Sequence, residues 1–115
     1  MARVLYADDD QEIQRAAKSI LSKAGYETLI AKDGEEALRL SKEQKPDCIL
    51  LDYLMPGMDG IQVCEALQKD EDTKHIPVIM VTAYPHEKEK ALAAGAVDFI
   101  SKPVERTDLL LRIKS

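Results

Sequence analysis

The sequence predicts an α/β domain in which a five-stranded parallel sheet is covered by helices on both faces. Five short apolar runs alternate along the 115 residues with segments of helical period. The runs at 48–51 and 78–81 are continuously apolar, which is typical of strands buried on both faces. Strands that alternate with helices in this way pair in parallel. We expect a single domain over 1–115.

The first half of the chain predicts two strands and two helices. The strands are expected at 3–7 and 27–31, and a first helix between them, because apolar residues recur every three or four positions from 13 to 24. Gly25 then ends this helix, because glycine accepts positive φ. Asp33 is the expected cap of the second helix, and Glu36 three positions later completes a capping box.

The second half continues the alternation. Strands are expected at 48–51, 78–81 and 97–100, and helices at about 59–69, 86–94 and 107–113. Right-handed crossovers between parallel strands leave few topologies, and the doubly wound order 2-1-3-4-5 fits best.

Composition excludes several classes of protein. A net charge of -5 argues against a nucleic-acid surface, which needs clustered Lys and Arg. No apolar run approaches the ~20 residues of a membrane span, and no signal-peptide pattern begins the chain. Cys48 and Cys64 lie in apolar segments without paired spacing, so we expect buried, reduced thiols. A cytoplasmic protein without direct nucleic-acid or membrane partners is expected.

Polar residues follow four of the five predicted strands, at the edge where ligands bind in such sheets. They are Asp8, Asp9 and Asp10, then Asp52, then Thr82, then Ser101 and Lys102. Clustered carboxylates repel one another, and a hard divalent cation, best Mg²⁺, relieves the repulsion. A carboxylate can also attack phosphorus, while a metal, an ammonium and a hydroxyl stabilise the transferring group. The pattern therefore predicts phosphoryl transfer to an aspartate.

Each of these residues also has an ordinary structural explanation. A lone Asp after a strand is usually a turn or cap residue, and the acidic run 8–10 suits a helix N-terminus. Lys102 alone is a surface lysine, and Thr82 alone is a strand-end residue. The joint placement of these groups on successive central strands favours a site.

Five segments carry a resemblance over essentially the whole chain. They are VLYADDD at 4–10, PDCILLD at 46–52, MPGMDG at 55–60, PVIMVTA at 77–83 and AGAVDFISKP at 94–103. In this order and spacing they resemble the receiver domains of two-component response regulators. The resemblance implies a flavodoxin-like (βα)5 fold with the same strand order, so the prediction of that order is not independent of the family.

The resemblance implies a phosphoacceptor and a metal site. Asp52 would take a phosphoryl group from a histidine kinase or a histidine phosphotransfer domain. Asp9 and Asp52 would bind Mg²⁺ directly together with the backbone carbonyl of Leu54, and Asp8 would bind it through water. Lys102 would pair with the phosphoryl oxygens.

The resemblance also implies a switch. Thr82 would move towards the phosphoryl group and Phe99 would rotate inward with it, and the bond between Lys102 and Pro103 would be cis. The fourth helix, fifth strand and fifth helix would signal to an output domain or a downstream protein, in a monomer or a phosphorylation-dependent dimer. The first helix, around residues 11, 14 and 15, would dock the kinase. Such a domain is not a turnover enzyme.

Three alternatives remain. A phosphohydrolase of the haloacid-dehalogenase type also uses a strand-end Asp, a Thr, a Lys and Mg²⁺, but Glu12 stands where that family has Thr or Val. A degenerate receiver that binds partners without phosphorylation generally lacks the acceptor, an acidic partner or the lysine, all of which are present here. A nucleotide-binding domain would need a Gly-rich loop after the first strand.

Overall fold

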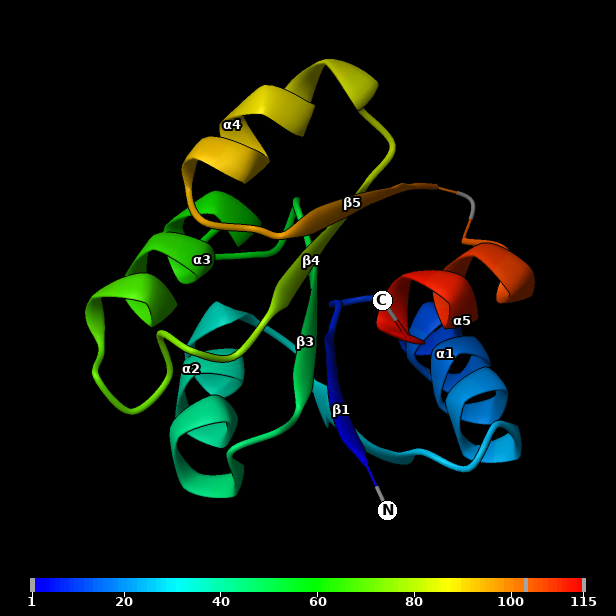
Figure 1. Cartoon of the computed structure of the whole chain (residues 1–115). Coiled ribbons are helices and arrows are strands. Elements are labelled where there is room, and N and C mark those ends of the chain that lie inside the picture. Colours follow the sequence, from blue (N-terminus) through cyan, green and yellow to red (C-terminus); the bar gives the residue numbers. More distant parts are fainter. Residues whose placement is uncertain (1, 103, 115) are drawn as a thin grey trace.

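The computed structural model describes residues 2–102 and 104–114, which form a parallel sheet between two layers of helices (Figure 1). The sheet has five strands in the order β2-β1-β3-β4-β5, which confirms the predicted doubly wound topology. The strands are β1 (Arg3–Ala7), β2 (Glu27–Ala31), β3 (Cys48–Asp52), β4 (Val78–Thr82) and β5 (Asp98–Ser101). The helices are α1 (Gln11–Lys23), α2 (Gly34–Gln44), α3 (Gly60–Lys69), α4 (Lys88–Ala93) and α5 (Arg106–Lys114), and a 3₁₀ turn η1 (Pro85–Glu87) precedes α4.

The sheet divides the apolar core into two parts. Alternate residues of a strand point to opposite faces, so Leu5 packs towards α2, α3 and α4, while Tyr6 packs towards α1 and α5 (Figure 1). β3 and β4 are buried along their whole length, as their continuous apolar runs predicted. Both cysteines are buried free thiols, also as predicted. Within residues 2–102 and 104–114, no helix combines the length and apolar character that a membrane crossing requires.

Several predicted boundaries shift by one or two residues. α1 begins at Gln11, two residues before its first apolar position, because Asp10 accepts hydrogen bonds from two backbone N–H groups of its first turn. The fourth helix begins with the 3₁₀ turn η1. The last strand begins at Asp98 rather than at the predicted residue 97, and Val97 before it is 63% exposed. Ala16 and Ala24, assigned to the apolar face of the first helix, are also exposed.

The predicted capping box at α2 forms only in part. The Asp33 side chain accepts from the backbone N–H of Glu36 at 2.8 Å. The Glu36 carboxylate, however, reaches one residue further back: it accepts from the backbone N–H of Lys32 at 3.0 Å instead of that of Asp33. A complete reciprocal box occurs at α3, where Asp59 and Gln62 bond to each other's backbone N–H groups.

The strand register aligns the ends of the central strands. Ala7 pairs with Leu51, so the next residues, Asp8 and Asp52, lie side by side. Thr82 pairs with Ser101, and Lys102 follows directly. The carboxyl edge of the sheet therefore gathers the polar residues that the sequence places after each strand.

Gly60 begins α3 where the helix approaches the end of β3 most closely. A methyl group at this position would lie 2.7 Å from the Asp52 carbonyl oxygen and 2.7 Å from Met80 Sδ. We expect Gly60→Ala to lower the free energy of unfolding by about 2 kcal/mol, because overpacking outweighs the better helix propensity of alanine. Urea unfolding measures the change. Glu65→Ala, at an exposed position of the same helix, should change it by less than about 0.5 kcal/mol; equal effects would contradict the packing argument.

Candidate functional site

Three carboxylates meet at the carboxyl ends of β1 and β3. Asp8 follows β1 and is 1% exposed, and Asp52 ends β3 and is 4% exposed. Asp9 is exposed at the mouth of the site. Each of the three offers an oxygen, and these oxygens lie within 4.8 Å of one another. Carboxylates held this closely form a strongly negative pocket with hard oxygen donors.

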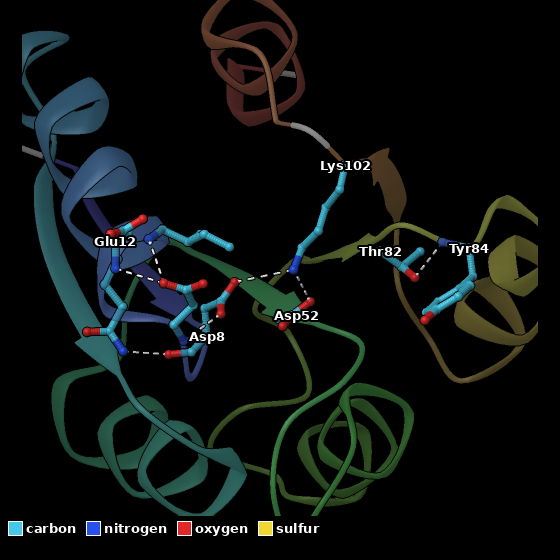
Figure 2. Close-up of polar contacts among 9 residues, drawn as sticks. Asp8, Glu12, Asp52, Thr82, Tyr84 and Lys102 are labelled. Atoms are coloured by element: carbon cyan, nitrogen blue, oxygen red, sulfur yellow. Dashed lines mark hydrogen bonds and ion pairs between the residues drawn. The ribbon is translucent and has the colours of Figure 1, made fainter.

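Lys102 reaches into this pocket from the end of β5 (Figure 2). Its Nζ lies 2.8 Å from Asp52 Oδ1 and 3.6 Å from Asp8 Oδ2. Its backbone N–H donates to the carbonyl of Thr82 at 2.8 Å, which ties the lysine to β4. The ammonium therefore balances part of the negative charge on the two buried aspartates.

Asp8 is fixed by its neighbours except at one oxygen. Its Oδ1 accepts from the backbone N–H of Asp10 at 2.9 Å, and its backbone carbonyl accepts from Gln14 Nε2 at 2.6 Å. Its buried Oδ2 has no hydrogen-bond donor among the described residues, although the Lys102 ammonium lies near it. A buried carboxylate oxygen without a donor, beside two further carboxylates, suits a divalent cation that prefers oxygen ligands.

The environment of the pocket shifts the pKa values of its groups. Burial raises the pKa of Asp52 to about 6, against the hydrogen bond from Lys102, while the nearby charge of Asp8 adds to the rise. Burial likewise raises the pKa of Asp8. Burial alone would lower the pKa of Lys102, but the hydrogen bond and charge of Asp52 outweigh it and the pKa is raised. Near neutral pH the lysine is charged, and Asp52 is ionised in most molecules.

The two expected switch residues are both buried. Thr82 is tied to the β4–α4 connection, since its hydroxyl accepts from the backbone N–H of Tyr84 at 3.0 Å. Figure 2 shows Thr82 beside Tyr84 and apart from the pair formed by Asp52 and Lys102. Phe99 lies inward already, at 8% exposure. Their expected movements remain predictions.

Other expected roles are settled only in part. Leu54 lies in the connection after β3 with an exposed side chain, and the role of its carbonyl as a metal ligand remains a prediction. Pro103, and with it the expected cis bond, lies outside the described residues. Gln11 and Arg15 are exposed on α1, as a docking surface requires, but Gln14 is partly buried and bonds to Asp8.

Sequence reasoning missed the contributions of Gln14 and Tyr6 to the site. Tyr6 is 1% exposed on β1; burial and then the charges of Asp8 and Asp52 raise the pKa of its phenol. Gln14 follows the helix cap Asp10 by one turn, and Tyr6 precedes Asp8 by two residues in the strand. The spacing of these two residues from Asp10 and Asp8 is the signal that the sequence offers.

Comparisons with known proteins agree on one family. The family model described as the response regulator receiver domain matches residues 4–114. The chain is 38% identical over 117 residues to the protein PilH of Pseudomonas aeruginosa, and the match covers 100% of this chain and 97% of PilH. It is 40% identical over 116 residues to the response regulator PleD of Caulobacter vibrioides, covering 99% of this chain but only 26% of PleD.

A solved structure shows the same fold. The receiver domain of the sensor histidine kinase PA1611 from Pseudomonas aeruginosa matches with a TM-score of 0.91 and 28% identity, covering 98% of this chain and 94% of that domain. That structure is described as holding a magnesium ion coordinated in its active-site cleft.

The raised pKa of Asp52 makes stability depend on pH. Folded Asp52 holds its proton up to about pH 6, whereas an unfolded aspartate loses it near 3.8, so stability falls as pH rises between these values. A shift of two pKa units corresponds to about 3 kcal/mol. Asp52→Asn removes this charge, and in EDTA we expect it to raise the free energy of unfolding at pH 8 by about 2 kcal/mol, with no gain near pH 4.

Urea unfolding of both proteins at pH 4, 6 and 8 measures this difference. Asp72→Asn, at an exposed aspartate far along the chain, serves as the control and should follow the wild type. A variant that is less stable than the wild type at pH 8 would contradict the account of Asp52.

Proposed function

The chain belongs to the response regulator receiver domain family of two-component systems, and from this premise we propose that Asp52 accepts a phosphoryl group from a histidine kinase or a histidine phosphotransfer domain. The observation that carries the proposal is the position of Lys102 Nζ, 2.8 Å from Asp52 Oδ1. Two further carboxylates lie within 4.8 Å of that acceptor. A buried carboxylate, an ammonium beside it and a cluster of oxygen donors thus share one pocket.

Mg²⁺ is the proposed cofactor. The cluster offers only hard oxygen donors, and the buried Asp8 Oδ2 lacks a hydrogen-bond donor among the described residues. We propose that Asp9, Asp52 and the Leu54 carbonyl bind the ion directly and that Asp8 binds it through water. Bound there, Mg²⁺ would neutralise negative charge on the phosphoryl group.

In the proposed reaction a carboxylate oxygen of Asp52 attacks phosphorus. The bond between phosphorus and the nitrogen of phosphohistidine breaks, and the electron pair leaves with the imidazole. With a pKa of about 6, Asp52 is mostly ionised at neutral pH, as a nucleophile must be. Lys102, already beside Asp52, pairs with the phosphoryl oxygens once the acyl phosphate has formed.

The proposed output is a change of surface rather than a released product. The Thr82 hydroxyl, which accepts from the Tyr84 N–H, would turn to donate to a phosphoryl oxygen, and Phe99, already buried, would repack further inward with it. The surface of α4, β5 and α5 would then signal to an output domain or a downstream protein, in a monomer or a phosphorylation-dependent dimer. The protein would act in the cytoplasm as a phosphoacceptor switch and not as a turnover enzyme.

The geometry disfavours the phosphohydrolase. That family needs two acids, spaced as Asp8 and Asp10 are, that both face the reaction. Here the Asp10 carboxylate accepts from the backbone N–H groups of Glu12 and Ile13 and caps α1. A degenerate receiver is disfavoured because the acceptor, the acidic partners and the lysine all lie in one pocket.

Phosphorylation from a small-molecule donor tests the acceptor. The chain incubated with Mg²⁺ and acetyl phosphate should gain one phosphoryl group by intact mass, and Asp52→Asn should gain none. Asp72→Asn, an exposed aspartate outside the pocket, should gain one as the wild type does. Labelling that persists in Asp52→Asn would refute the acceptor assignment, and catalytic release of orthophosphate without any adduct would favour the phosphohydrolase.

Lys102→Ala separates the chemistry from the switch. The side chain packs at the edge of the sheet, so we expect the variant to fold and to accept the label, because Asp52 remains. The phosphoryl oxygens then lack their ammonium, so hydrogen exchange in α4, β5 and α5 should change less on phosphorylation than in the wild type.

Lys69→Ala, at an exposed position on α3, is the matched control. A full exchange response in Lys102→Ala would remove the lysine from the switch.

A further inference from the structure

Gln14 lies on α1, and its side chain reaches the backbone of Asp8. Its Nε2 donates to the backbone carbonyl of Asp8 at 2.6 Å, and the residue is partly buried. Gln11 and Arg15 on the same helix are exposed. The three neighbouring positions of α1 therefore differ, and only Gln14 is engaged with the site.

The Asp8 carbonyl needs a donor that the sheet does not supply. The N–H of Asp8 donates to the carbonyl of Ala31 at 3.0 Å, the last residue of β2. The paired residues of β1 end at Ala7, so the Asp8 carbonyl lies beyond the strand ladder. Asp8 is 1% exposed, and a buried carbonyl without a donor is unfavourable. Gln14 supplies the missing hydrogen bond.

The first turn of α1 thus holds Asp8 at two points. Gln14 fixes its backbone, and the N–H of Asp10 fixes Oδ1 at 2.9 Å. Asp10 is itself fixed, because its side chain accepts from the N–H of Glu12 at 2.8 Å. With backbone and Oδ1 both bonded, Oδ2 is the oxygen left to face Lys102 and the other carboxylates.

We propose that Gln14 is a positioning residue for the cation site: by bonding the Asp8 carbonyl it fixes the direction of the Asp8 carboxylate. The inference rests on the proposed Mg²⁺-dependent phosphorylation of Asp52, and it assigns to α1 a role in building the site besides the expected docking of a kinase. Asp8 would hold the ion through water, and the loss of outer-shell groups of a metal site typically weakens metal affinity by tenfold or more.

Gln14→Met tests this role, since methionine has a similar length but no hydrogen to donate. Calorimetric titration with MgCl₂ should show about tenfold weaker binding. The Mg²⁺ concentration that half-saturates labelling by acetyl phosphate should rise by the same factor, while the rate at saturating Mg²⁺ stays near that of the wild type. Ser19→Met changes an exposed residue of the same helix, outside the expected docking surface, and should leave both values unchanged.

Gln14→Glu separates the lost hydrogen bond from a change in size or charge. Glutamate also lacks the donor, yet its added negative charge alone would tighten cation binding. Weaker Mg²⁺ binding in this variant as well would therefore identify the hydrogen bond as the cause. Circular dichroism checks that both variants fold.

Two contrary results are possible, and they would overturn different parts of the proposal. Wild-type Mg²⁺ affinity in Gln14→Met, with the wild type labelled normally, would overturn the positioning role and leave the proposed function intact. Failure of the wild type itself to bind Mg²⁺ or to accept the label would overturn the proposed function, and the positioning role with it.

Discussion

The repulsion among three carboxylates is the constraint on which the site depends. The parallel register of β1 and β3 brings them within 4.8 Å of one another, and two of them are buried. Two like charges about 4 Å apart repel by roughly 1–4 kcal/mol at effective dielectric constants of 80 to 20. A fully buried leucine or valine contributes about 1.5–3 kcal/mol, and β3 and β4 consist almost entirely of such residues. The core can therefore hold an unfavourable charge arrangement in place.

Charge balance explains why one lysine does not complete the pocket. Asp8, Asp9 and Asp52 carry three negative charges when ionised and Lys102 carries one positive charge, which leaves two negative charges. A divalent cation matches that remainder. The raised pKa of Asp52 points the same way, since it reflects a carboxylate that burial and its neighbours disfavour in the charged form. The carboxylates of the pocket repel one another. Binding of a cation, or of a phosphoryl group together with a cation, would relieve this repulsion and stabilise the folded protein.

Features that follow from strand ends could be predicted from the sequence, whereas features that depend on side-chain direction could not. The strand order and the meeting of Asp8, Asp52 and Lys102 follow from period, register and topology. The incomplete capping box at Asp33 depends on how far one carboxylate reaches. The inward turn of Gln14 depends on a carbonyl beyond the strand ladder that lacks a partner. Such choices are decided by neighbours in space.

The acidic run after β1 shows how one local turn divides similar residues among different roles. Asp8 still follows the direction of the strand and is buried, Asp9 projects from the turn and is exposed, and Asp10 takes an extended conformation and caps α1. Asp8 and Asp10 are coupled. The Asp10 N–H donates to Asp8 Oδ1, while the Asp10 carboxylate accepts from N–H groups in the first turn of the helix. Since α1 also supplies the donor to the Asp8 carbonyl, the position of this helix and the direction of the buried carboxylate are determined together. An acidic cluster and a helix N-terminus are here one structural unit.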